Sequence, residues 1–165
     1  METKKVNLSD YDPKTVPSGK NMKIGIVTAE WNPQITSALA QGAYDTLLKN
    51  GVDDSDIYLI RVPGSFELPT GASTMLNSRL DLDAVICLGC VIQGETRHFD
   101  FICEAVANGL TKLALEDGRP VIFGLLTTNN IQQAIERSGG KHGNKGVEAA
   151  ITAIKMVDMQ RRVLG

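Results

Sequence analysis

One of the two histidines in this chain falls where a helix is expected to begin. Residues 83–93, DAVICLGCVIQ, are apolar enough to form a buried strand, and GETRHFDFIC, residues 94–103, follows directly. His98 then lies in the first helical turn, and histidine is the side chain whose charge changes most readily near neutral pH. A neutral imidazole can accept a proton from a substrate and return it. His98 is therefore a candidate general acid and base, and a histidine that merely caps the helix start is the alternative.

Two segments could bind an anion. GCVIQGET, residues 89–96, resembles a phosphate-binding P-loop, but Glu95 stands where that motif has lysine. A carboxylate there opposes nucleotide hydrolysis, whereas the loop's backbone N–H groups could still hold a single phosphate. In ERSGGKHGNKG, residues 136–146, four glycines alternate with Arg137, Lys141, His142 and Lys145. Glycine lets the backbone approach an anion, and arginine can grip phosphate with two bonds. A solvated linker with incidental charge is equally compatible with this composition.

The three cysteines, Cys87, Cys90 and Cys103, are an odd number, which favours a reducing compartment. The CLGC spacing of the first two would suit a metal or redox site. Both lie in an apolar run, however, and no second ligand pair accompanies them. We therefore expect buried, apolar thiols.

Alternating segments predict the elements that hold these residues. Apolar runs predict strands at 22–29, 56–62, 83–92 and 120–127. Apolar residues three or four apart predict helices at 34–51 and 67–80, a third through Ile102 and Leu113, a fourth capped by Thr128 or Asn129, and a last one at about 147–161. This order predicts an α/β domain over residues 22–165, a three-layer α/β/α sandwich whose four-stranded parallel sheet carries helices on both faces. Residues 1–21, polar and containing Pro13 and Pro17, are predicted to form an N-terminal arm.

Composition excludes some functions. The 165 residues are 42% hydrophobic and 22% charged, which is ordinary for one soluble domain. The net charge of −2 gives no indication of a basic surface for nucleic-acid binding. No apolar stretch approaches the roughly 20 residues of a membrane span. The first residues contain no apolar signal core, so we expect a cytoplasmic protein.

The carboxyl ends of parallel strands are where such sheets bind ligands. The segments expected there are 30–32, 63–69, 89–98 and 123–130, which bring Trp31, Phe66 and Phe123 toward His98. An aromatic crevice with one acid–base group and two anion-binding segments suits a planar heterocycle and a phosphate-bearing partner. The residues alone do not identify the reaction.

Five blocks carry a resemblance to a known family: KIGIVTAEWN, VPGSFELP, LGCVIQGETRHFDFI, PVIFGLLTTNN and QAIERSGGKHGNKG. In order and spacing they resemble the lumazine synthases of riboflavin biosynthesis, from about Lys23 to Met159. The resemblance implies a flavodoxin-like fold and a transferase without metal or organic cofactor. Its reaction condenses 5-amino-6-(D-ribitylamino)uracil with 3,4-dihydroxy-2-butanone 4-phosphate to 6,7-dimethyl-8-ribityllumazine, releasing phosphate and water.

The resemblance also implies a role for each matching residue. His98 would carry protons, Arg137 would pair with the phosphate, and Lys141 would lie near it. Trp31 replaces an aromatic residue, usually phenylalanine, that stacks on the pyrimidine. The remaining residues of the ribitylaminouracil site would be Asn32, Ser65, Phe66, Glu67, Cys90, Val91, Ile92 and Phe123. The butanone phosphate would be held by Gly94, Glu95 and Thr96 together with Arg137.

In this family the site lies between adjacent subunits of a homopentamer, with Phe123 and the Arg137 segment supplied by the neighbour. Some members build icosahedral capsids from pentamers, and association with riboflavin synthase is a further expectation. The short 138–146 segment favours a capsid, whereas Pro13 and Pro17 oppose it. The main alternative function is a non-catalytic flavin-binding or shell-forming relative. A flavodoxin-like electron carrier is less compatible, because TAEWNPQ is poor in glycine and contains Glu30.

Overall fold

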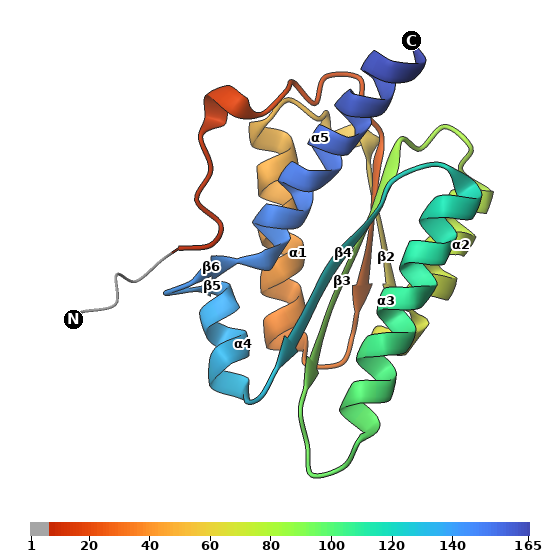
Figure 1. Ribbon diagram of the computed structural model, residues 1–165. Coiled ribbons are helices and arrows are strands. Elements are labelled where there is room, and N and C mark those ends of the chain that lie inside the picture. Colours follow the sequence, from red (N-terminus) through yellow and green to blue (C-terminus); the bar gives the residue numbers. More distant parts are fainter. Residues whose placement is uncertain (1–6) are drawn as a thin grey trace.

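Four apolar runs form one parallel sheet in the computed structural model, which describes residues 7–165 (Figure 1). The strands are β1 (Ile24–Ala29), β2 (Ile57–Val62), β3 (Ala84–Ile92) and β4 (Val121–Thr128), in the spatial order β2-β1-β3-β4. Every pairing among them is parallel. The predicted α/β architecture is confirmed.

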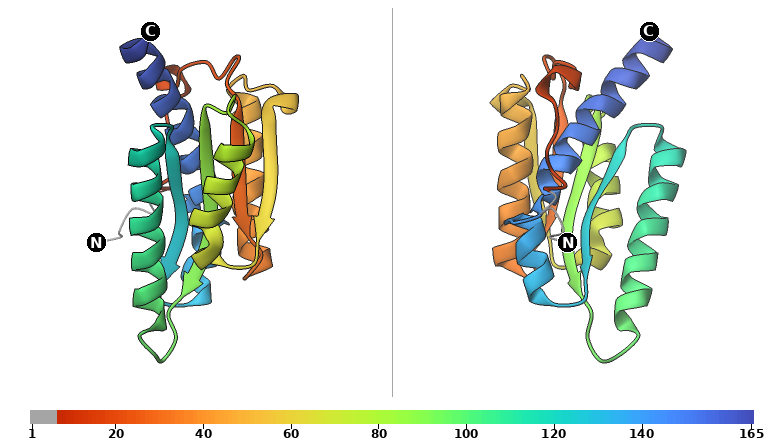
Figure 2. Two further views of the ribbon diagram at one scale, coloured as in Figure 1. Left: turned by 90° about the vertical axis from the view of Figure 1, so that its right-hand side faces the viewer. Right: turned by 60° about the vertical axis from the view of Figure 1, so that its left-hand side comes forward.

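Among residues 7–165, five α-helices flank the sheet in two layers (Figure 2). They are α1 (Pro33–Lys49), α2 (Leu68–Ser78), α3 (His98–Asp117), α4 (Ile131–Arg137) and α5 (Lys145–Leu164). Helices α1, α4 and α5 pack on one face, and α2 and α3 on the other. Short 3₁₀ turns occur at Pro13–Thr15, Asp54–Asp56 and Ser65–Glu67. Within residues 7–165, no helix combines the length and the apolar character that crossing a membrane requires.

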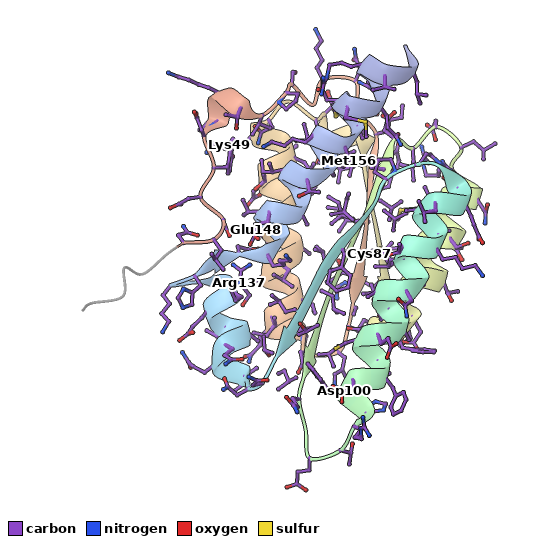
Figure 3. The ribbon with its side chains drawn as sticks, in the orientation of Figure 1. Lys49, Cys87, Asp100, Arg137, Glu148 and Met156 are labelled. Atoms are coloured by element: carbon purple, nitrogen blue, oxygen red, sulfur yellow. The ribbon has the colours of Figure 1, made fainter. Side chains whose placement is uncertain are left out.

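Alternate residues of β3 pack into two separate hydrophobic cores, one on each face of the sheet. Ile86 and Leu88 pack toward α1 and α5, whereas Val85 and Cys87 pack toward α2 and α3. Figure 3 shows Cys87 between the sheet and α3. Because helices cover both faces, a central parallel strand is apolar at every position, which explains why residues 84–90 are all buried.

The start of α4 differs from its prediction. Neither Thr128 nor Asn129 caps this helix; the side chain of Asn130 does so by accepting a hydrogen bond from the Gln133 backbone N–H at 2.9 Å. Thr128 instead donates its hydroxyl to the Asn130 carbonyl at 3.0 Å. Four consecutive residues of the TTNN stretch can cap a helix, so only the length of β4 decides among them.

The glycine-rich segment after α4 is more ordered than a linker. Ser138–Gly140 (β5) and Gly143–Asn144 (β6) form a short antiparallel pair. The side chain of Asn144 then caps α5 by accepting from the Gly146 N–H at 2.8 Å, so this helix begins two residues before the expected Val147.

The predicted arm is described from residue 7 onward, and its first described residues pack on this pair. The Leu8 N–H donates to the His142 carbonyl at 3.2 Å, and the Ser9 hydroxyl donates to the Asn144 carbonyl at 2.8 Å. Further along, the Gly19 N–H donates to the Asn50 carbonyl at 2.7 Å. Residues 1–6 of the predicted arm lie outside the described residues.

Arg119 fastens the ends of α2 and α3 together. Its guanidinium donates to the Leu76 and Arg79 carbonyls at 3.0 and 3.1 Å, satisfying acceptors that the end of α2 leaves free. Asp117 receives the Arg119 Nε–H at 2.7 Å, and this hydrogen bond holds the pKa of the Asp117 carboxyl below its ordinary value. Both helices begin at the opposite end of the sheet, so Arg119 joins them at the end away from the strands' carboxyl ends.

Helices α1 and α5 cross at contacts that require glycine. A Cβ built on Gly146 would overlap the Leu39 carbonyl oxygen of α1, and one built on Gly42 would lie 2.6 Å from Asn144 Nδ2. We expect Gly146→Ala to lower the free energy of unfolding by about 3 kcal/mol, because backbone atoms cannot yield as a flexible side chain can. Urea unfolding would measure this loss. Gly94→Ala is the control, since a Cβ there meets nothing within 4 Å; an equal effect of the two variants would contradict the prediction.

Candidate active site

A cavity of about 520 Å³ opens where β1, β2 and β3 end. Its walls come from the three loops that follow these strands and from the first turns of α3. The lining residues are Trp31, Asn32, Gly64, Ser65, Phe66, Glu67, Cys90, Val91, Ile92, His98 and Ile102. The cavity therefore gathers nine residues that the sequence predicted for the site, and it adds Gly64 and Ile102.

The loop after β1 supplies an exposed aromatic ring and a strained polar residue. The Trp31 N–H donates to the Pro63 carbonyl at 3.2 Å, which holds the backbone while 73% of the residue stays exposed. Asn32 has a left-handed backbone with φ of 61°, a conformation that asparagine tolerates better than most residues. Its amide donates to the Cys90 carbonyl at 3.2 Å, so it ties the start of α1 to the end of β3.

The loop after β2 presents a fixed carboxylate. The Gly64 N–H donates to Glu67 Oε2 at 3.1 Å, which holds the Glu67 side chain back over its own 3₁₀ turn, Ser65–Glu67. Phe66 is 58% exposed, whereas Ser65 is buried. A carboxylate held in this way can accept hydrogen bonds from hydroxyl groups of a ligand.

The end of β3 offers backbone groups to the cavity. The pairing of β3 with β1 stops at Leu88, while its pairing with β4 continues to Ile92. Residues 89–92 therefore have, within the described chain, no strand partner on the β1 side, and the cavity lies there. Burial raises the pKa of the Cys90 thiol to about 11, so it is a neutral thiol at pH 7. Backbone N–H and C=O groups at such an edge can recognise a planar ring with matching donors and acceptors.

His98 and Ile102 line the cavity from successive turns of α3. Their spacing of four residues puts both on one helix face, and this spacing could have identified Ile102, which the sequence pattern assigned only to the helix core. The His98 N–H donates to the Thr96 hydroxyl at 3.4 Å. His98 thus lines the same cavity as the aromatic and carboxylate residues of the two preceding loops.

Gly94, Glu95 and Thr96 form an exposed loop between β3 and α3 that extends past the end of the sheet (Figure 1). None of the three lines the cavity. They flank it, however, because β3 ends at Ile92 and α3 begins at His98.

Arg137 lies in a second group, away from the residues that line the cavity. Its guanidinium donates to Glu148 Oε2 of α5 at 2.5 Å and to the His142 carbonyl at 2.6 Å (Figure 3). The Arg137 side chain is only 16% exposed. Lys141 pairs with Glu136 at 2.9 Å, which holds the pKa of the Glu136 carboxyl below its ordinary value. Glu148 gave no signal in the sequence, because a single glutamate on a helix is usually solvated.

Phe123 belongs with this second group. The sequence order placed it near the carboxyl end of its strand, but it is the third residue of β4 and pairs in register with Cys87. It lines a hollow of about 360 Å³ between β4 and α5, together with Lys145, Glu148, Ala149, Thr152 and Met156. Apart from the 94–96 loop beside the cavity, one chain therefore carries the predicted site residues in two places: the cavity, and the surface formed by β4, α4 and the start of α5.

Known proteins resemble the chain along nearly its whole length. A sequence model of the 6,7-dimethyl-8-ribityllumazine synthase family matches residues 21–161. The protein with that name from Porphyromonas gingivalis is 54% identical over 161 residues, covering 98% of this chain and 99% of its own. The one from Cytophaga hutchinsonii is 55% identical over 157 residues, covering 95% and 98%. The one from Parabacteroides distasonis is 54% identical over 158 residues, covering 96% and 98%.

Proposed function

The chain belongs to the 6,7-dimethyl-8-ribityllumazine synthase family, and we propose that the cavity at the ends of β1, β2 and β3 is its pyrimidine site. The protein is a transferase of riboflavin biosynthesis that condenses 5-amino-6-(D-ribitylamino)uracil with 3,4-dihydroxy-2-butanone 4-phosphate, releasing phosphate and water. The observation that carries the site proposal is the meeting of an exposed indole, a fixed carboxylate, an open strand edge and His98 around one cavity.

Each part of the pyrimidine substrate has a matching group. The uracil ring stacks on Trp31, while its polar edge meets the backbone of Cys90, Val91 and Ile92. The ribityl chain lies along Asn32 and residues 65–67, where Glu67 accepts from its hydroxyls. This arrangement presents the reactive amine to His98 across the cavity.

The phosphate of the second substrate requires the other group of residues. Arg137, with Lys141 nearby, supplies the positive charge, and the N–H groups of residues 94–96 supply neutral donors. Arg137 and Phe123 lie on the β4–α5 side of the chain and not in the cavity. This separation supports a site completed by a neighbouring copy, which contributes Phe123 and Arg137. The assembly we propose is a homopentamer, and a capsid built from pentamers is a further form of it.

The reaction needs several proton transfers and close positioning. The substrate amine attacks the ketone and loses water to give an imine, and proton removal then eliminates phosphate. The resulting enol tautomerises, and a second attack with loss of water closes the ring. His98 carries the protons between these steps. Because amine and ketone can condense without a catalyst, much of the acceleration comes from orientation.

Following product formation by absorbance, with both substrates and a no-enzyme control, tests this function. The enzyme is expected to produce the lumazine well above the uncatalysed rate. A rate equal to the control would instead favour the non-catalytic flavin-binding or shell-forming alternative.

His98→Gln is expected to lower kcat by about tenfold. This loss is smaller than the roughly 10²–10⁴-fold that is typical of general acid–base groups. The loss is modest because substrate orientation is preserved. Steady-state rates over a range of pH would measure it, with Asp100→Asn as the control in the same exposed helical turn. An identical loss in both variants would show that the helix start, and not the imidazole, matters.

We further infer that the protein works in the cytoplasm, which its three free thiols support. Its product is the substrate of riboflavin synthase, so that enzyme is the protein partner we propose.

A further inference from the structure

Both groups that hold Arg137 also have a donor of the N-terminal arm within reach. The His142 carbonyl accepts from the Arg137 guanidinium at 2.6 Å and from the Leu8 N–H at 3.2 Å. Glu148 Oε2 accepts from Arg137 at 2.5 Å and lies 3.4 Å from the Ser9 hydroxyl (Figure 3). The first described residues of the arm therefore contact Arg137 indirectly, through each of these two acceptors.

Ser9 is fixed against β6 by its own side chain. Its hydroxyl accepts from the Asn144 N–H at 2.5 Å and donates to the Asn144 carbonyl at 2.8 Å. A hydroxyl has one proton, so Ser9 donates either to this carbonyl or to the Glu148 carboxylate. The Asn7 side chain shapes the turn, because its Oδ1 accepts from the Ser9 N–H at 3.0 Å and its Nδ2 donates to Asp10 at 2.8 Å.

Gly143 makes room for this part of the arm. Its backbone is left-handed with φ of 86°, and a Cβ built on it would overlap Asn7 Oδ1 and Ser9 Oγ. Glycine meets both demands, since it has no Cβ. One glycine of the segment 136–146 is thus explained by the approach of the arm, which joins the two parts of the chain beside Arg137.

We propose that Ser9 is a positioning residue for the phosphate-bearing substrate. It holds β6 and the Glu148 carboxylate in place, so that the Arg137 guanidinium keeps one direction. Arginine has many rotamers, and fixing one of them beforehand lowers the entropy lost when an anion binds. The inference rests on the proposed function and deepens it, because it gives the arm a part in phosphate binding. In the proposed assembly, the arm of one copy thus acts on the cavity of the next.

Ser9→Ala should raise KM for 3,4-dihydroxy-2-butanone 4-phosphate, and the inhibition constant of inorganic phosphate, by about three- to tenfold. KM for the pyrimidine and kcat should change little, because Ser9 does not line the cavity. Ser9→Thr keeps the hydroxyl and should restore both phosphate constants. The matched control is Thr15→Ala, because the Thr15 hydroxyl donates to the Asp12 carbonyl at 2.7 Å within the arm; it should alter none of these constants.

Unchanged phosphate constants in Ser9→Ala would overturn this role. An equal rise of both KM values, or a loss that Ser9→Thr shares, would overturn it as well, because the hydroxyl would then not act on the phosphate site in particular. Thermal midpoints of all variants would identify a loss of fold. If the wild-type protein formed no product, the proposed function itself would fail and this role with it, whereas an active wild type with an unaffected Ser9→Ala removes only the role of Ser9.

Discussion

Replacing Arg137 by alanine is expected to lower kcat/KM for the butanone phosphate by about 10²–10³-fold. The guanidinium can present two parallel N–H groups to a phosphate that carries negative charge and then leaves with it. It is already held in place, because Glu148 and the His142 carbonyl accept its hydrogen bonds and only 16% of the side chain is exposed. A preoriented cation loses little entropy when the substrate binds, so its removal should be costly.

Separate KM values for the two substrates would show where this loss lies. The KM for the phosphate-bearing substrate should rise, whereas that for the pyrimidine should change little. Glu148→Gln is the matched control, since it removes the charge of the Arg137 partner and keeps the guanidinium. Circular dichroism of both variants would identify a loss of fold. Equal effects on the two KM values would refute the assignment of Arg137 to phosphate.

Replacing Trp31 by alanine should raise KM for the pyrimidine substrate on the order of 30-fold, within the roughly 1–3 kcal/mol that stacking on an aromatic provides. The indole is 73% exposed and its N–H backbone bond to Pro63 does not depend on the side chain. Its removal should therefore leave stability nearly unchanged. The effect would be seen as a change of KM with the fold intact.

Trp31→Phe is the informative companion variant, because phenylalanine keeps a stacking face at the same position. It should recover most of the affinity that alanine loses. Initial rates at varied pyrimidine concentration, with the butanone phosphate saturating, measure both variants. An alanine variant with wild-type KM would show that Trp31 is only an exposed residue at the edge of the cavity.

The sheet and its helices were predictable because their signals are local. Residues 84–92 are apolar without interruption, as a strand covered on both faces must be, and α1 shows apolar residues four apart. The residue that caps the helix after β4 was not predictable, because several neighbouring residues there can all cap a helix. The pairing of β5 with β6 depends on contacts with the arm and with α5, which no local pattern encodes.

The cavity was predictable for a similar reason. Once the strands are known, the parallel topology places Trp31, Glu67 and His98 at one edge of the sheet. The same rule misplaced Phe123, because it treated all of residues 123–130 as the carboxyl end of a strand in which Phe123 is only the third residue. The Arg137–Glu148 pair joins two helices across a turn of the chain, and the β5–β6 pair contacts the arm through Ser9. These features arise only when the packed structure exists.

Helix α5 is the last of the described elements in sequence order, and it covers part of one sheet face. Its residues Ala149, Ala150, Ala153, Ile154 and Val157 belong to the core that also contains Ile24, Ile86 and Leu88. Before residues 145–164 are made, only α1 and the short helix α4 shield that surface from other nascent chains. Synthesis that stops before residue 145 would therefore release a chain with an uncovered apolar sheet, a substrate for chaperones and proteases.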